Sequence, residues 1–310
     1  MVPVLNAALA GADARELTAL DLTAPRNASA PAAVTLENVT VSYPNGRHTR
    51  RTILDSINLR IEQGEFVVVL GVTGCGKSTL LRLMLGQEQP TSGRICVSGR
   101  PVERVDSRSG YVPQKYSLFP DRTVLDNLTM GPETALYHIL GRLLPHFRAF
   151  RRTVQAEALQ QLAKMGLSPS DAAKYPHQLS GGMQQRVAIA QALMMKSRVL
   201  LMDEAFSALD PGTRTSLQRL MRSLWQERKP TVVFVTHNTA EALFLGTRLI
   251  VLARTGEPEH GCRIAFDHKL PPDGMSLRRN GQEFLDLVDT VERYSRIGCN
   301  SDLSPEEESL

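Results

Sequence analysis

The segment from Gly71 to Ser78, which reads GVTGCGKS, restricts the fold of this chain more than any other feature. It fits the pattern G-x-x-x-x-G-K-[ST]. The apolar run Phe66–Leu70 precedes it and predicts a strand buried on both faces of a parallel sheet. Residues Ser78 to Leu85 are rich in leucine and predict a helix directly after it. A strand, a glycine turn and a helix in this order predict a phosphate-binding loop in an α/β protein.

Each part of this loop has a physical role in holding phosphate. Glycines permit the tight turn and let backbone N–H groups approach phosphate oxygens, and the helix N-terminus adds its dipole. Lys77 is expected to reach the β- and γ-phosphates, and the Ser78 hydroxyl to ligate Mg²⁺. The alternative, a glycine turn that binds nothing, does not account for the flanking strand and helix. The residues predicted to bind nucleotide are Gly71, Thr73, Gly74, Cys75, Gly76, Lys77 and Ser78.

The chain continues to alternate between apolar strands and helices. Val199–Met202 and Val232–Val235 predict two more buried strands, and residues 211 to 227 predict a helix between them. Ile250 to Leu252 is a further candidate strand. Residues 123 to about 177 carry apolar side chains mainly at helical spacing. This order predicts a parallel sheet covered by helices and interrupted by a helical insertion.

A hairpin is predicted before the phosphate loop. Apolar and polar residues mix from Val34 to Val41, which is typical of a half-buried strand, and a second strand is predicted from Ile53 to Ile61. Residues 43–46, YPNG, are a strong turn signal. The segment between the strands is expected to be a solvated basic loop containing His48, Arg50 and Arg51.

Composition narrows the class of protein. The chain has 310 residues, of which 42% are hydrophobic and 22% are charged, as in ordinary globular proteins. Its net charge of +4 gives no argument for nucleic acid binding, which calls for a clustered basic face. The four cysteines include no CxxC pair and predict neither a zinc site nor a disulfide framework. Because no apolar run approaches the roughly 20 residues that span a bilayer, we expect a cytoplasmic chain.

Two carboxylates, Asp203 and Glu204, follow the predicted strand Val199–Met202. Ligand sites in open α/β sheets lie at the carboxyl ends of strands. Asp203 is therefore placed to hold Mg²⁺, and Glu204 to act as the general base that polarises the attacking water. An ordinary acidic strand end is the alternative, and the phosphate loop upstream argues against it.

The segment Leu179 to Arg186, which reads LSGGMQQR, closely resembles the signature sequence of ABC ATPases. In physical terms Ser180, Gly181 and Gly182 open a helix and form a second anion site. The resemblance implies a P-loop NTPase of the ABC type: a RecA-like core with a mainly parallel sheet, an antiparallel β subdomain and an inserted helical subdomain. It also implies that two copies pair head to tail, with each ATP held between the phosphate loop of one copy and the signature of the other.

The resemblance assigns roles to four further residues. Tyr43 is expected to stack on adenine, and Gln114 to contact Mg²⁺ and the attacking water. Asp210, at the end of the segment Ser207-Ala208-Leu209-Asp210, is expected at the dimer interface, and His237 at the γ-phosphate. The predicted catalytic residues are thus Glu204, His237, Gln114 and Lys77. The predicted metal ligands are Ser78, Gln114 and Asp203. The predicted cofactor-binding residues are those of the loop together with Tyr43, Ser180, Gly181, Gly182 and Asp210.

The resemblance covers about Val34 to Asp267 and suggests three regions. Residues 1–33 are predicted to be a flexible extension, 34–270 an ABC ATPase domain with a helical subdomain at about 115–195, and 271–310 a C-terminal helix and acidic tail. Tyr137 to Phe150 looks like an insertion, with a basic cluster at its end. A solvated helix face is favoured over contact with a permease or lipid for Arg148, Arg151 and Arg152.

Several short segments resemble importer ATPases of the nitrate, sulfonate and taurine group, among them SLFP at 117–120, YPHQ at 175–178 and EALFL at 241–245. The implied cofactors are ATP and Mg²⁺. The implied partners are a second copy, membrane-spanning permease subunits and an external solute-binding protein, with the chain held at the inner face of the cell membrane. An exporter ATPase and a soluble ABC ATPase remain alternatives, whereas a phosphotransferase with the same loop would not need the signature.

Overall fold

The computed structural model describes residues 32–45, 49–105, 107–115, 117–137, 145–254, 260–271 and 282–296. The chain divides into two units, Met1–Ala30 and Pro31–Leu310, and all described residues belong to the second. The predicted N-terminal extension, the acidic tail and residues 138–144 of the predicted insertion lie outside the described residues.

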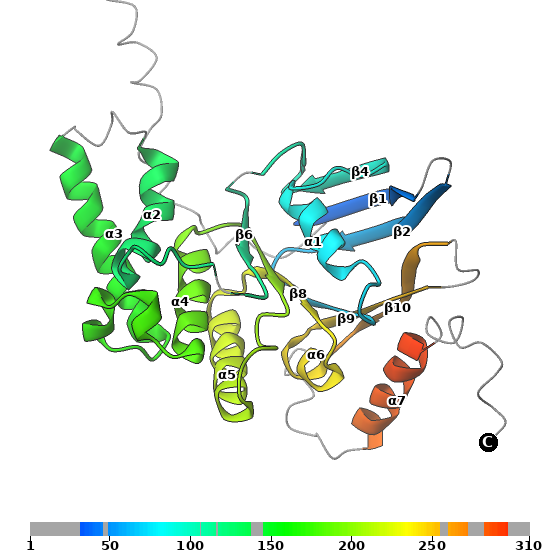
Figure 1. Ribbon diagram of the computed structural model, residues 1–310. Coiled ribbons are helices and arrows are strands. Elements are labelled where there is room, and N and C mark those ends of the chain that lie inside the picture. Colours follow the sequence, from blue (N-terminus) through cyan, green and yellow to red (C-terminus); the bar gives the residue numbers. More distant parts are fainter. Residues whose placement is uncertain are drawn as a thin grey trace, which may run out of the picture. The chain divides into compact units, whose positions relative to one another are not determined.

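Ten strands form one mixed sheet in the described part of the chain, in the order β5-β4-β1-β2-β10-β9-β3-β8-β7-β6 (Figure 1). The strands are β1 (Val34–Asn45), β2 (Thr49–Ile61), β3 (Phe66–Leu70), β4 (Ser92–Val97), β5 (Arg100–Pro101), β6 (Ser109–Val112), β7 (Val199–Asp203), β8 (Thr231–Thr236), β9 (Arg248–Arg254) and β10 (Cys262–Lys269). The α/β fold with a mainly parallel core and an antiparallel portion is thus confirmed.

The parallel half runs from β9 through β3, β8 and β7 to β6. Every residue of β3, β7 and β8 is buried, as the uninterrupted apolar runs predicted. Alternate side chains enter two hydrophobic clusters: Val67 and Val69 join one, and Val68 and Leu70 join the other. Because both faces are covered, the carboxyl ends of these strands are where functional side chains can reach solvent.

The antiparallel half contains β1, β2, β4 and β5, and its hairpin is longer than predicted. β1 continues through Pro44 to Asn45, and Arg50 and Arg51 pair with it from β2. Placing these two arginines in a loop was therefore wrong. In the described residues β4 pairs with β1 only as far as Thr40, so the end of β1 is an edge strand, where proline is tolerated because its missing N–H breaks no ladder.

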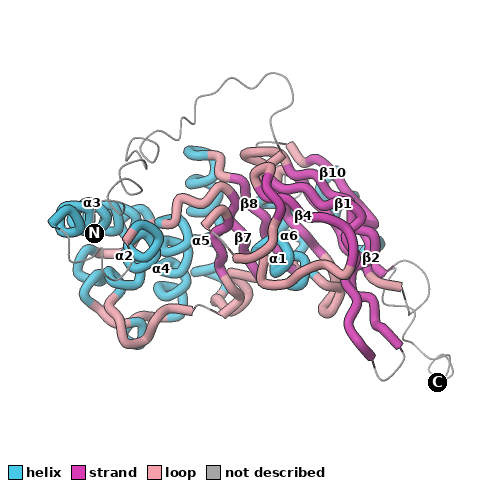
Figure 2. Tube along the Cα trace, turned by 90° about the horizontal axis from the view of Figure 1, so that it is seen from above, coloured by secondary structure: helices cyan, strands magenta, loops and turns pink. Residues whose placement is uncertain are grey.

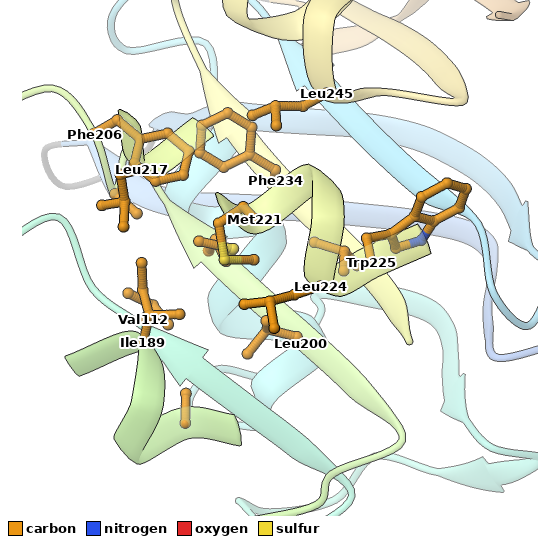
Figure 3. Packing of buried hydrophobic residues seen from close by; sticks show 14 of the residues in the cluster. Val112, Ile189, Leu200, Phe206, Leu217, Met221, Leu224, Trp225, Phe234 and Leu245 are labelled. Atoms are coloured by element: carbon orange, nitrogen blue, oxygen red, sulfur yellow. The ribbon is translucent and has the colours of Figure 1, made fainter. Parts of the chain in front are cut away.

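Helices cover both faces of the parallel strands. They are α1 (Lys77–Leu85), α2 (Val124–Leu136), α3 (Pro145–Lys164), α4 (Gly181–Met194), α5 (Pro211–Arg228), α6 (Thr239–Leu245) and α7 (Gln282–Arg296), with the 3-10 helices η2 (Pro169–Ala173) and η3 (Pro176–Gln178). Leucines of α1 share one hydrophobic cluster with Val67 and Val69. Figure 3 shows α5 on the opposite side, where Leu217, Met221 and Leu224 pack with Phe234.

Three helices, α2, α3 and α4, contact one another and gather next to β6 (Figures 1 and 2). Thr123 caps α2 by accepting a hydrogen bond from the backbone N–H of Asp126. Arg151 of the predicted basic face pairs with Asp126 and Glu133 of α2, at 3.6 and 3.3 Å. Arg151 therefore joins two helices. None of the helices in the described ranges has the length and apolar character needed to cross a membrane.

Candidate active site

The loop between β3 and α1 adopts the conformation that its glycines were expected to permit. Gly74 and Gly76 have φ angles of 83° and 94°, in the left-handed region where glycine is favoured. A Cβ on Gly76 would lie 2.7 Å from Leu54 Cδ2, so the loop also packs tightly on β2. Thr73 and Gly74 are exposed at the tip of the loop, and Cys75 and Gly76 are buried beneath it.

Lys77 begins α1 and turns its ammonium group back over this loop. Its Nζ donates to the carbonyl oxygens of Gly71 at 2.7 Å and Val72 at 3.0 Å. The residue is only 6% exposed. A buried positive charge fixed above a glycine turn at a helix N-terminus provides strong attraction for phosphate oxygens.

Ser78 and Asp203 meet across the gap between α1 and the end of β7. Ser78 Oγ donates to Asp203 Oδ1 at 3.1 Å, and the hydroxyl of Tyr111, from β6, donates to Asp203 Oδ2 at 3.4 Å. Burial raises the pKa of the Asp203 carboxyl, and the neighbouring Glu204 carboxylate raises it further, although Ser78 acts in the opposite direction. Asp203 also raises the pKa of the half-buried Tyr111 to about 12, together with burial, which is the larger cause.

The Ser78–Asp203 pair suits a hard divalent cation. Hydroxyl and carboxylate oxygens are ligands that Mg²⁺ prefers, and a cation would relieve the unfavourable burial of two adjacent carboxylates. Within the residues that the structure describes, no three His, Cys, Asp or Glu side chains gather in a metal-binding cluster. A cation here would therefore need oxygens of phosphate or water in addition to these two side chains, as Mg²⁺ commonly does.

Glu204 lies between two polar side chains from different segments. Its Oε2 accepts a hydrogen bond from Gln114 Nε2 at 3.1 Å, and its Oε1 lies 3.2 Å from His237 Nδ1. The Glu204 side chain is 17% exposed and that of His237 is 57% exposed. The carboxylate is thus oriented on both oxygens yet remains accessible to water, as a general base requires.

The remaining predicted site residues divide into two places. Ser180 caps α4 by accepting from the N–H of Met183, and Gly182 packs against Thr213 of α5. Asp210 caps α5 by accepting from the N–H of Thr213, which lowers the pKa of its carboxyl. Among the described residues no hydrogen bond or ion pair joins the segment 180–182 to the loop 71–78. The structure does not bring the predicted second anion site onto the phosphate loop of the same chain.

Tyr43 lies near the end of β1, where its ring is 37% exposed. Its hydroxyl donates to Glu88, and its pKa is raised, first by burial and then by that carboxylate. An exposed ring near the loop is compatible with stacking on a base, and this role stays a prediction.

A second cysteine lies beneath the phosphate loop, and sequence reasoning missed it. Cys262 of β10 forms a side-chain hydrogen bond with Cys75, and both residues are buried. This bond, with a smaller contribution from the Lys77 ammonium, lowers the pKa of Cys75 to about 7, while the same bond and burial raise the pKa of Cys262. The two cysteines are far apart in sequence, and β10 forms a ladder pair with β2 at Cys262 and Leu54, so no local signal predicted the contact.

A family described as ABC transporter matches residues 54–207 of this chain. An uncharacterized ABC transporter ATP-binding protein of Methanocaldococcus jannaschii is 40% identical over 245 residues, which are 78% of this chain and 85% of the relative. A nitrate import ATP-binding protein of Synechococcus elongatus is 40% identical over 64% of this chain and 69% of its own length. A taurine import ATP-binding protein of Rhizobium johnstonii is 43% identical over 64% of this chain and 71% of its own.

Solved structures give the same picture for the fold. A dimeric ATP-binding cassette in a post-hydrolysis state, bound to ADP and Pi, aligns with a TM-score of 0.63 and 32% sequence identity. The alignment covers 77% of this chain and 99% of that one.

Proposed function

This chain belongs to the ABC transporter family as an ATP-binding and ATP-hydrolysing subunit, and from that premise we propose that it powers the import of a small solute through a separate permease. The observation that carries the proposal is the position of Glu204. Its carboxylate lies between Gln114 and His237, next to the Ser78–Asp203 pair. The proposed general base, the candidate cation site and the phosphate loop therefore meet at the carboxyl ends of β3, β7 and β8.

In the proposed complex the triphosphate lies on the loop Gly71–Ser78, with Lys77 directed to the β- and γ-phosphates. Ser78, Asp203 and Gln114 would hold Mg²⁺, which would supply charge neutralisation for the phosphates. Tyr43 would stack on the adenine ring. The ammonium group of Lys77 is already fixed above the loop, so little reorganisation would accompany phosphate binding.

Hydrolysis would begin at Glu204. Its carboxylate accepts a proton from a water molecule, whose oxygen attacks the γ-phosphorus in line with the bond to the leaving β-phosphate oxygen. ADP and inorganic phosphate are the products. Gln114 and His237 contact the carboxylate, and His237, with its exposed ring, would donate to the γ-phosphate.

The signature residues would act on a second copy of the chain. Ser180, Gly181 and Gly182 begin α4 away from the loop of their own chain, and the N-terminus of this helix would offer an anion site to a second copy. We propose that two copies pair head to tail, with Asp210 at their interface, and that each ATP joins the loop of one copy to the signature of the other. The solved cassette that this chain resembles is dimeric.

The proposed partners are membrane-spanning permease subunits and, indirectly, an external solute-binding protein, with this chain held at the inner face of the membrane. Relatives named for the import of nitrate and taurine support a small solute as cargo. Nothing in the proposed mechanism places the solute on this chain, because the described site is built for nucleotide.

Replacing Glu204 with glutamine tests the proposal. The amide keeps the shape but is not a base, so kcat should fall at least about 100-fold while ATP affinity is retained. Glu227→Gln, an exposed position on α5, is the matched control and should hydrolyse ATP normally. Wild-type phosphate release by the Glu204 variant would overturn the assignment of the base.

A further inference from the structure

A buried glutamate that is not among the proposed catalytic residues is hydrogen-bonded to the residues on either side of His237. Glu241, in the first turn of α6, is 6% exposed. Its Oε2 accepts a hydrogen bond from the hydroxyl of Thr236 at 2.7 Å, and its Oε1 accepts from Gln218 Nε2 of α5 at 2.9 Å. A buried charge held by two donors is costly to form, so this arrangement calls for an explanation beyond packing.

Glu241 contacts both neighbours of His237 in the chain, Thr236 through its carboxylate and Asn238 through its backbone N–H. Thr236, the residue before it, donates to Glu241 and also accepts from the backbone N–H of Asn238 at 3.1 Å. Asn238, the residue after it, accepts a hydrogen bond from the N–H of Glu241 at 3.1 Å. The position of His237 is therefore fixed through Glu241.

Arg214 of α5 connects this carboxylate to the segment 206–210. Its guanidinium donates to the carbonyl oxygens of Phe206 at 3.2 Å, Ser207 at 3.3 Å and Leu209 at 2.9 Å. Its Nε lies 4.0 Å from Glu241 Oε1. The segment begins two residues after Glu204, whose carbonyl accepts from the N–H of Ser207 at 3.0 Å.

We infer that Arg214 and Glu241 form a positioning pair that keeps Glu204 and His237 in register and links both to the segment 206–210. Arg214 holds the backbone that follows Glu204, and Glu241 bonds the side chains of Thr236 and Asn238 on the two sides of His237. A displacement of the segment 206–210 would move Arg214, change its attraction to Glu241 and so shift His237 relative to Glu204. In the proposed dimer this segment contacts the second copy. Binding of that copy would therefore change the position of His237 relative to Glu204 through Arg214 and Glu241.

The planar guanidinium is essential to this role. Its fork of N–H groups reaches three carbonyl oxygens at once while one edge faces the carboxylate, which a lysine ammonium on a flexible stem does not reproduce. Arg214→Lys keeps the charge and removes the fork. Glu241→Gln keeps the shape and removes the charge. Neither residue touches the reacting atoms, so both act through the catalytic pair.

The test is steady-state ATP hydrolysis by Arg214→Lys, Glu241→Gln and the double variant, with the full chain. Each single change should lower kcat about tenfold or more and leave KM for ATP within about twofold, since misplacing catalytic groups affects turnover rather than ground-state binding. The double variant should lose no more than the more affected single variant, because the two residues act as one unit. Arg219→Lys, exposed on the same helix, is the control and should match the wild type.

If a change at Glu241 prevents folding, Thr236→Val replaces it in the test. This variant keeps the buried volume and removes the hydroxyl that donates to Glu241, so it should also lower kcat. The inference is overturned if Arg214→Lys retains wild-type kcat, if KM rises in parallel with the loss of kcat, or if the two losses multiply. It rests on the proposed role of Glu204, which Glu204→Gln tests separately. Full turnover by the Glu204→Gln variant would contradict the assignment of the base. An inactive Glu204→Gln variant together with a fully active Arg214→Lys variant would contradict only the positioning role of Arg214 and Glu241.

Discussion

Glu204 combines a left-handed backbone conformation, φ 44°, with two oriented carboxylate oxygens. Non-glycine residues in this region cost energy and persist only where the surroundings enforce them. Here the N–H of Glu204 donates to the carbonyl of Val235 in β8 at 2.9 Å, which ties the turn after β7 to the strand that ends before His237. The strained turn directs the carboxylate of Glu204 toward Gln114 and His237.

The Cys75 thiol should ionise in the neutral range. Because its pKa is lowered to about 7, its thiolate should form as the pH passes through about 7 rather than near 9.0, the ordinary value. Since the residue is buried, the measurement is the ultraviolet absorbance of the thiolate across this pH range, which needs no access of a reagent, in a chain whose Cys96 and Cys299 are replaced by serine.

The control for this titration is Cys262→Ala. Removing the hydrogen-bond partner that contributes most to the lowered pKa of Cys75 should move the midpoint upward. A midpoint that stays in place in Cys262→Ala would contradict the role given to the thiol pair.

At the scale of elements, the first turns of α4 and α5 pack together at Gly182. A Cβ on Gly182 would lie 2.5 Å from Thr213 Cγ2, so the signature helix approaches α5 more closely than any other residue type permits. Arg186 of α4 strengthens the same contact by donating to Ser216 Oγ of α5 at 3.1 Å, and it also donates to Met165 O, just after α3, at 2.7 Å. The signature segment is thus held by α5, which also follows the segment 206–210.

Gly182→Ala should destabilise the folded chain. Overpacking costs about 1–3 kcal/mol, and alanine gains up to about 1 kcal/mol over glycine in a helix, so we expect a net loss of about 1 kcal/mol. Urea unfolding without nucleotide measures it. In a Thr213→Ser background, which lacks the obstructing methyl, the same change should be neutral or stabilising. An equal loss in both backgrounds would show that the contact with Thr213 is not the cause.

At the scale of the whole molecule, the predicted anion site at 180–182 lies away from the phosphate loop of the same chain. The two sites would bind one ATP together only in a pair of copies. Glu204→Gln with ATP and Mg²⁺ should elute as a dimer in size-exclusion chromatography with light scattering, because hydrolysis no longer removes the bridging nucleotide. Adding Ser180→Arg should return it to a monomer, since a bulky cation would fill the signature site. Ser223→Arg, at an exposed position of α5, is the matched control and should leave the dimer intact. A dimer that survives Ser180→Arg would contradict the head-to-tail arrangement.

Local sequence was sufficient for the parts of the molecule where one segment carries its own signal. The apolar runs of β3, β7 and β8 and the glycines of the loop 71–76 specify buried strands and a turn, whatever surrounds them. Ser78 was predicted from the phosphate loop, and Asp203 and Glu204 from the carboxyl end of a buried strand, whereas Gln114 and His237 were predicted from the family resemblance. The strands β4 and β10 were missed, since their mixed burial leaves no regular alternation.

Sequence by itself therefore determined the α/β core and the phosphate loop, whereas the identity of the catalytic base and the division into regions at 33 and 270 stay predictions. Only the tertiary structure decided that Cys262 lies against Cys75, that Tyr111 bonds Asp203 and that Arg214 lies 4.0 Å from Glu241. The physical reason is the distance along the sequence between the residues that interact. Turns and buried strands are set by neighbours in the chain, but these contacts join segments that approach one another only when the sheet assembles and the helices pack on it.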